Sequence, residues 1–530
     1  MKNNKNLFLE EVFSRAIKYH KNKQLNLAEE NYLEIINKNP KHIRALNNLG
    51  IIYFSLKRYN EAIKVFEKTI NIDENYLSAY NNLGLLFKQI RDYKKAIINL
   101  NNAIKINPNY FEAHNNIGLV FYECEEYFEA IKNYEKAVKI NPKYFEAYNN
   151  IGLAFSKCGE YLKAINSYKK AVKINPNYFK AYNNIGIAYY ECGEYQKAIN
   201  NFKKSLEINP NYTGAYCNIG LVYEKTEDTN KAFNVYQKVP KMDKNYKYAQ
   251  YNIASLFYKI KKYEKAAKIF KLIDYKNSKS YLLKSLYELE DESNFFDELD
   301  NETKRGKTDA VIASLISSAK IKYGIKKKNL FCEDPLNYVL NKNLKNKYDF
   351  EDIFIKTSKE ILNDNDFKDR PQLLLKNGIQ SAGNIFYNKN KNVKKIEHII
   401  HKELENYRTN FGKSNEGIIK NWPKIYELKG WLVKMKKGGK IEPHIHDHGW
   451  LSGSIYINVP PKSNTNSGNL VVSLIEKENK TIDKHIDETS KIIDVVTGSL
   501  CLFPASLFHY TIPFKSDEER IVLAFDVMSK

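Results

Sequence analysis

Cysteine is scarce in this chain, and long uncharged apolar stretches are missing. Six cysteines among 530 residues are too few for a disulfide framework. The sequence contains no run of 18 uncharged apolar residues, and its start, MKNNKNLFLEEVFSRAIKYH, lacks the apolar core of a signal peptide. These absences predict a soluble protein of the reducing cytoplasm with no membrane span.

The chain also lacks a compact arginine-rich block. Lysine and arginine number 84 against 62 acidic residues, a formal net charge of +22 that would suit nucleic acid or an acidic membrane. The excess is mostly lysine and is spread along the whole sequence. A solvated surface accounts for that distribution, so we predict no nucleic-acid partner.

A 34-residue repeat dominates the first half of the chain. One column holds small residues: Gly50, Gly84, Gly118, Gly152, Gly186 and Gly220. A second column holds alanine, and a third, beginning at Tyr53, holds aromatic residues that can fit against small residues on a facing helix. Prolines between the units mark where helices end. Each unit is predicted to be a helical hairpin, and hairpins of this kind must stack to bury their apolar faces.

This pattern resembles the tetratricopeptide repeat, with seven well-matched units over residues 43–280 and a weaker unit near residues 9–42. The resemblance implies an all-α solenoid over residues 1–280 whose groove binds a protein or peptide. A further 34-residue column consists of asparagines: Asn48, Asn82, Asn116, Asn150, Asn184, Asn218 and Asn252. Their amides can hold a peptide main chain, as the likeness to the repeats of protein O-linked sugar transferases implies, or they can tie one repeat to the next.

The 34-residue period is lost after residue 280, although helix-forming sequence continues to about residue 345. We interpret residues 281–345 as a helical cap and connector that gives the solenoid a polar closing face. Over residues 346–530, apolar and β-branched runs alternate with turn residues, which predicts a mainly-β domain. The expected strands include YELKGWLVKM, LSGSIYINV, GNLVVSLIE, KIIDVV, GSLCLF and ERIVLAFDV.

Histidines gather in this domain, in the stretch EPHIHDHGW at residues 442–450. On an extended strand, His444 and His446 would point to the same face and could share one metal ion. A third ligand must come from another strand, and His509 in LFPASLFHYTIPF is the natural candidate. Imidazole ligands suit iron, zinc, copper or nickel.

Residues 431–530, together with FCEDPL at 331–336 and NGIQSAGNIF at 377–386, resemble 2-oxoglutarate- and Fe(II)-dependent oxygenases that follow tetratricopeptide repeats. The resemblance implies a double-stranded β-helix, or jelly roll, with Fe(II) and 2-oxoglutarate as cofactors. It also implies that His444 and His509 bind the iron, while Arg520 binds the distal carboxylate of 2-oxoglutarate. A guanidinium group suits that task because it binds a carboxylate through two donors.

The sequence departs from the usual oxygenase pattern in two places. The first ligand segment reads His-x-His where His-x-Asp is usual in oxygenases. The family that this chain resembles tends to show His-x-His here, so we favour His446 as the remaining ligand and keep Asp447 as the alternative. A hydroxyl usually found two residues after the arginine is missing, and Tyr456 or Ser452 could replace it in binding the cosubstrate. The pocket walls are expected to include Trp450 and Tyr510.

Three functions are compatible with these observations. The first is a 2-oxoglutarate- and Fe(II)-dependent dioxygenase that hydroxylates a substrate brought by the repeats. The second is a non-catalytic repeat scaffold whose jelly roll is degenerate or binds a structural metal. The third is a cupin-type dioxygenase that needs no 2-oxoglutarate, for which a three-histidine site would be normal.

Overall fold

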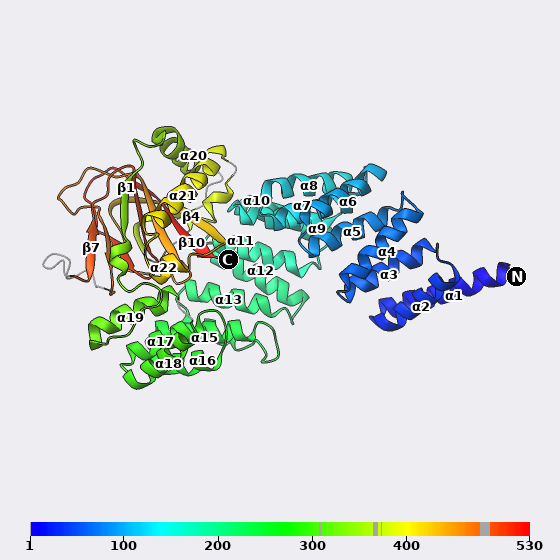
Figure 1. Ribbon diagram of the computed structural model, residues 1–530, viewed down its shortest axis with the longest axis horizontal. Coiled ribbons are helices and arrows are strands. Elements are labelled where there is room, and N and C mark those ends of the chain that lie inside the picture. Colours follow the sequence, from blue (N-terminus) through cyan, green and yellow to red (C-terminus); the bar gives the residue numbers. More distant parts are fainter. Residues whose placement is uncertain are drawn as a thin grey trace. The chain divides into compact units, whose positions relative to one another are not determined.

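The computed structural model describes residues 2–306, 309–363, 369–370, 372, 374–388, 390–476 and 488–530. The chain divides into two compact units, one formed by residues 1–155 with 167–176 and the other by residues 156–166 with 177–530. The first unit is built of helices (Figure 1). The second unit contains further helices followed by a β-rich domain.

The repeats form consecutive helical hairpins. Their helices are α1 (Lys2–Lys21), α2 (Leu25–Lys38), α3 (Ile43–Ser55), α4 (Tyr59–Ile72), α5 (Leu77–Gln89), α6 (Tyr93–Ile106), α7 (Phe111–Glu123), α8 (Tyr127–Ile140), α9 (Phe145–Lys157), α10 (Tyr161–Ile174), α11 (Phe179–Glu191), α12 (Tyr195–Ile208), α13 (Thr213–Lys225), α14 (Thr229–Tyr236), α15 (Tyr246–Lys259) and α16 (Tyr263–Leu272). Helix bounds recur with the period of the sequence. The expected all-α solenoid is therefore confirmed.

The repeated glycine is required by close packing inside each hairpin. A Cβ atom at Gly118 on α7 would lie 2.5 Å from Cε1 of Tyr134 and 3.1 Å from the carbonyl oxygen of Ala130. Both neighbours belong to α8 and are fully buried. The ring that covers the glycine thus comes from the second helix of the hairpin, and not from the aromatic column that begins at Tyr53.

Three more helices follow the repeats: α17 (Ser278–Glu288), α18 (Glu292–Lys304) and α19 (Ala310–Tyr323). We expected a polar closing face here, and that expectation is wrong for α19, which is buried from Ala310 to Ala319. One part of α19 packs into the core of α15–α18, and Ala313 joins the core of the β-rich domain. The hydroxyl of Ser318 also donates to the carbonyl of Leu474. The β-rich domain therefore covers this end helix in place of solvent.

The β-rich domain contains two antiparallel sheets. Its strands are β1 (Leu340–Asn343), β2 (Asp369–Arg370), β3 (Leu375–Ser381), β4 (Tyr426–Ile441), β5 (Leu451–Asn458), β6 (Leu470–Ser473), β7 (Ser490–Ile493), β8 (Ser499–Pro504), β9 (Phe508–Thr511) and β10 (Arg520–Ser529). The large sheet has the order β1-β8-β5-β10-β4-β3-β2, and the small sheet has the order β7-β6-β9. Each run expected to be a strand forms one, so the mainly-β prediction is confirmed.

The two faces of the large sheet differ, because side chains alternate along each strand. On β10, Leu523 and Phe525 pack beneath helix α21 (Lys391–Asn410), together with residues of β4, β5 and β8. The intervening residues Val522, Ala524 and Asp526 face a cavity on the other side of the sheet. The small sheet contributes Leu470 and His509 to that cavity. Paired sheets of this kind suit a double-stranded β-helix, which remains a prediction. The domain boundaries at residues 280 and 345 also remain predictions.

Candidate metal site

The histidine-rich stretch lies in the connection between β4 and β5. We expected an extended strand here, but within it only His444 forms a bridge, to His509 on β9, and the chain turns at Asp447 and His448. The two bridging residues exchange backbone hydrogen bonds, with the amide of His509 donating to the carbonyl of His444 at 2.9 Å. This bridge brings the loop and the small sheet together.

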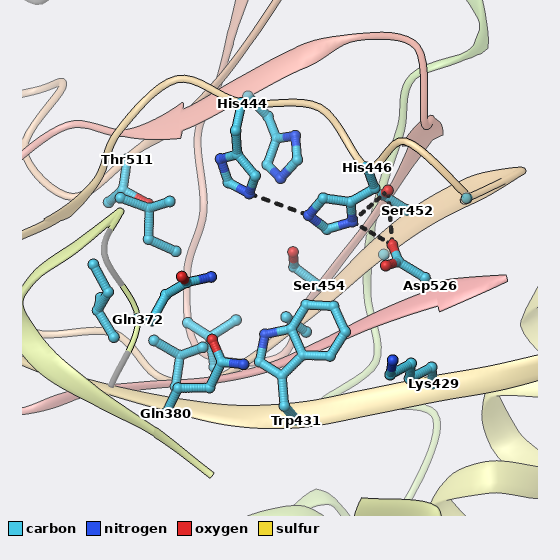
Figure 2. Close-up of a pocket in the computed structure, with 18 of the residues that line it drawn as sticks. Gln372, Gln380, Lys429, Trp431, His444, His446, Ser452, Ser454, Thr511 and Asp526 are labelled. Carbon is cyan, nitrogen blue, oxygen red and sulfur yellow. Dashed lines mark hydrogen bonds and ion pairs between the residues drawn. The ribbon is translucent and has the colours of Figure 1, made fainter. Parts of the chain in front are cut away.

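The side chains of His444, His446 and His509 converge in the cavity. Figure 2 shows the rings of His444 and His446 facing each other. One potential ligand atom from each lies within 4.8 Å of the others. The Nε2 atoms of His444 and His446 are 3.1 Å apart. Two nitrogens bound to one metal at about 2.1 Å, at a right angle, would be about 3 Å apart. The donor set therefore fits a metal ion that prefers imidazole.

Two of these rings are held in the neutral form that a metal requires. Burial, reinforced by the neighbouring His446, lowers the pKa of His444 to about 4. Burial together with the two neighbouring histidines places the pKa of His509 well below its usual value. The Nδ1 atom of His444 faces the carbonyl of Glu442 at 2.9 Å, which leaves its Nε2 lone pair directed at the cavity.

His446 is held by a carboxylate that the sequence interpretation missed. Its Nδ1 contacts Oδ1 of Asp526 on β10, and the hydroxyl of Ser452 on β5 lies 3.1 Å from the same nitrogen. Ser452 also donates to Asp526 at 3.0 Å. Burial alone would lower the pKa of His446, but Asp526 more than offsets this and the pKa is raised. Strand alternation from Arg520 could have identified Asp526, since residues an even number apart share a face.

Arg520 enters the same cavity as a buried cation without a carboxylate partner. Its residue exposure is 1%, and in the described part of the chain it forms no ion pair, so the neighbouring acidic residues 517–519 do not neutralise it. One guanidinium NH donates to the carbonyl of Gly468, and the group lies 5.0 Å from the ring centre of Tyr456. Its Nε has no hydrogen-bond partner among the residues that the structure describes. Gly468 has φ +74°, and a Cβ there would lie 3.1 Å from the guanidinium.

The cavity has a volume of about 440 Å³ and is lined by most of the expected residues, Tyr456 and Tyr510 among them. Trp450 does not line it, and that expectation is wrong. Its ring packs against Phe331 at 5.0 Å in the core beneath α21, and its indole NH donates to the carbonyl of Ile418. The tryptophan in the cavity is Trp431 on β4, whose ring centre is 5.8 Å from that of His446.

Asp447, the alternative ligand, is turned toward another partner. Its carboxylate accepts a hydrogen bond from the hydroxyl of Tyr281 on α17. Asp447 lines the cavity but is not part of the three-histidine cluster. Helix α17, which follows the repeats, thus contacts the residue after His446.

Five members of the asparagine column form hydrogen bonds between repeats. The side-chain amide of Asn116 donates to Oδ1 of Asn81 at 2.7 Å, and Asn82, Asn150 and Asn218 make the same contact with the preceding repeat. Asn48 donates to the hydroxyl of Tyr32. These bonds match the second interpretation, in which the amides tie one repeat to the next. Peptide binding by the column remains a prediction.

Comparisons with known proteins agree with this organisation. Residues 429–526 match the family described as "Putative 2OG-Fe(II) oxygenase". Residues 43–109, 118–227, 213–246 and 248–280 match tetratricopeptide repeat families. A search of curated proteins gave no match. The chain therefore combines tetratricopeptide repeats with a domain of that oxygenase family.

The chain is also similar to solved structures over part of its length. MamA is 30% identical over 30% of this chain and 94% of its own, with a TM-score of 0.28. A tetratricopeptide repeat protein from Parabacteroides merdae is 18% identical over 47% of this chain and 98% of its own, with a TM-score of 0.38. YrrB, titled a TPR protein with an unusual peptide-binding site, is 20% identical over 35% of this chain and 95% of its own, with a TM-score of 0.29.

Tetratricopeptide repeats generally bind proteins or peptides. Across the described residues, no helix combines the length and the apolar character that crossing a membrane requires.

Proposed function

Because the chain joins tetratricopeptide repeats to a domain of the 2OG-Fe(II) oxygenase family, we propose that it is a 2-oxoglutarate- and Fe(II)-dependent hydroxylase. In this reaction 2-oxoglutarate and O2 yield succinate and CO2, and one oxygen atom enters a substrate C–H bond. The repeats would bind the protein or peptide that carries the substrate group. The observation that carries the proposal is a cavity that contains both a three-histidine cluster and a buried arginine that forms no ion pair with any described residue.

In this proposal His444, His446 and His509 hold the metal. A bound Fe(II) would supply oxygen activation coupled to the decarboxylation of 2-oxoglutarate. The low pKa values of His444 and His509 support this role, because neutral imidazoles offer a lone pair at the pH of the cell. The contact between Asp447 and Tyr281 supports His446 over Asp447 as the remaining ligand.

Arg520 is proposed to bind the distal carboxylate of 2-oxoglutarate. An unpaired charge in a buried site is costly, and a carboxylate ligand would remove that cost through charge-assisted hydrogen bonds. Tyr456 lies against the guanidinium and would border the bound carboxylate. Ser452 is a weaker candidate for the cosubstrate, since its hydroxyl is already engaged by Asp526 and His446.

The test is turnover of 2-oxoglutarate to succinate by the full chain with Fe(II), ascorbate and cell lysate as the source of substrate. We expect turnover in the wild type and its loss in His509→Ala. His398→Ala is the matched control, because His398 is an exposed histidine on α21 away from the cavity lining. Absence of turnover in the wild type would favour the non-catalytic scaffold, and turnover in His509→Ala would show that the site is elsewhere.

The three-histidine donor set also favours a second candidate, a cupin-type dioxygenase that uses no 2-oxoglutarate. The two candidates differ in the role of Arg520. If the hydroxylase proposal is right, Arg520→Ala loses activity and a large excess of 2-oxoglutarate partly restores it. Substrate oxidation in the absence of 2-oxoglutarate would instead identify the second candidate.

A further inference from the structure

We propose that Asp526, held by Ser452, positions His446 and supplies the negative charge that a site of three neutral histidines lacks. The inference rests on the metal site of the proposed function. It assigns a role to two residues that are not expected to touch the metal. In the usual facial triad, by comparison, a carboxylate binds the metal directly.

The contacts of His446 fix the orientation of its ring. Nδ1 meets Oδ1 of Asp526, while Nε2 lies 3.1 Å from Nε2 of His444. Figure 2 shows the ring between these two neighbours, with Ser452 beside Asp526. With the Nδ1 proton donated to Asp526, the lone pair of Nε2 faces the cluster. Asp526 therefore selects both the tautomer and the direction of the ligand atom.

Ser452 fixes the carboxylate in turn. It is 2% exposed and donates to Asp526 at 3.0 Å, from a position directly opposite on the neighbouring strand. Asp526 itself is 9% exposed and, among the described residues, forms no ion pair with a lysine or arginine. A buried carboxylate of this kind needs a nearby positive charge. A divalent metal on the far side of His446 would provide it.

Among the described residues, no carboxylate contacts Nδ1 of either of the other two histidines. Nδ1 of His444 faces the backbone carbonyl of Glu442, and Nδ1 of His509 is 3.5 Å from the carbonyl of Leu507. A carboxylate that accepts the ring NH makes an imidazole a stronger metal ligand than a carbonyl does. Asp526 is thus a direct acceptor for the ring NH of His446 and not for those of His444 and His509.

A purely structural ion pair between His446 and Asp526 is the competing explanation. It would need a second proton on Nε2, where His444 lies, and it would exclude His446 as a ligand. The two explanations differ in metal binding and not only in activity. Metal affinity is therefore the measurement that separates them.

The experiment is a Co(II) titration of the full chain, with Co(II) as a spectroscopic substitute for Fe(II) and binding followed by its visible absorption. We expect Asp526→Asn to weaken Co(II) binding by roughly 10–100-fold, the range typical for partners of metal-bound histidines. The absorption bands of the bound metal should shift as well, because the ligand strength of His446 changes. Ser452→Ala should weaken binding in the same direction and by less.

Asp517→Asn is the matched control, since it removes an exposed carboxylate outside the cavity whose partner is Lys437 at 3.0 Å. Its affinity and absorption bands should equal those of the wild type. The far-UV circular dichroism of each variant shows whether it is folded. If Asp526→Asn does not fold, the Co(II) affinity of Ser452→Ala tests the inference in its place.

The outcomes separate the inference from the proposed function. Wild-type affinity and bands in Asp526→Asn, with 2-oxoglutarate turnover intact in the wild type, would overturn the inference alone. Loss of binding in Asp447→Asn would overturn it as well, because Asp447 would then be the ligand. If the wild type did not bind Co(II), or if His509→Ala bound it as tightly as the wild type, both the inference and the proposed function would be overturned.

Discussion

Replacing Arg520 by methionine should make the protein more stable and at the same time unresponsive to 2-oxoglutarate. The guanidinium is buried, has no carboxylate partner in the described part of the chain, and leaves Nε without a hydrogen bond. Methionine has a similar length, carries no charge and adapts to irregular spaces. Replacing a buried ion pair by apolar residues of similar volume is often neutral or stabilises a protein by about 1–4 kcal/mol, and Arg520 lacks even the compensating charge of such a pair. We expect a gain within that range for the ligand-free chain.

The stabilisation by added 2-oxoglutarate should favour the wild type over Arg520→Met. A ligand at 100 times its dissociation constant stabilises the state that binds it by about 2.7 kcal/mol. The wild type should gain this amount from 2-oxoglutarate, whereas Arg520→Met should gain nothing. Added ligand should therefore narrow or reverse the difference in stability between the two proteins.

Urea unfolding followed by tryptophan fluorescence is the suitable assay. The three tryptophans of the chain are Trp422, Trp431 and Trp450, so the signal reports the β-rich domain and not the repeats. Lys437→Met is the control, because Lys437 is an exposed cation on β4 that pairs with Asp517 at 3.0 Å. This surface pair contributes about 0–1 kcal/mol, and the control should keep its response to ligand.

One result would refute the reasoning about Arg520. If Arg520→Met were several kcal/mol less stable and still gained stability from 2-oxoglutarate, the guanidinium would be a structural group. The anion site would then lie elsewhere in the cavity.

Three further predictions concern stability. In α13, Gly220→Ala should lower the free energy of unfolding by about 1–3 kcal/mol, since its Cβ would lie 2.5 Å from Cζ of a buried tyrosine ring. In Gly214→Ala the new Cβ would meet nothing closer than 3.6 Å, so this control variant should be as stable as the wild type or up to about 1 kcal/mol more stable. Hydrogen exchange in α13 measures the stability of both glycine variants. Asn116→Ala leaves the buried Oδ1 of Asn81 without its donor and should cost about 1–3 kcal/mol, measured by hydrogen exchange in the first unit. Burial would raise the pKa of Glu403, but two lysines, a tyrosine and an asparagine lower it to about 2. Its folded-state pKa is below the unfolded value of 4.5, so the protein should lose roughly 3 kcal/mol of stability as the pH falls from 4.5 to 2. Urea unfolding at a series of pH values measures this loss, which should be absent in Glu403→Gln.

Much of the fold follows from local patterns. A hairpin repeated every 34 residues buries the same positions each time, so the columns of glycine and alanine predict the solenoid directly. Alternation along each run likewise predicts the strands of the β-rich domain, because successive side chains on a strand point to opposite faces. The histidine cluster and Arg520 could be proposed from the sequence because their residue types are rare and chemically specific. Their convergence in one cavity agrees with that prediction.

The sequence by itself therefore determined the repeats, the class of each domain and a short set of candidate ligands. Only the tertiary structure decided which partner each side chain has. Asp526 meets His446 because β5 and β10 pair in one register, Asp447 turns away because a tyrosine of α17 lies beside it, and Trp450 packs beneath α21. Periodicity is a property of the local backbone, whereas strand register and helix docking depend on contacts between segments far apart in the chain. No local pattern specifies those contacts.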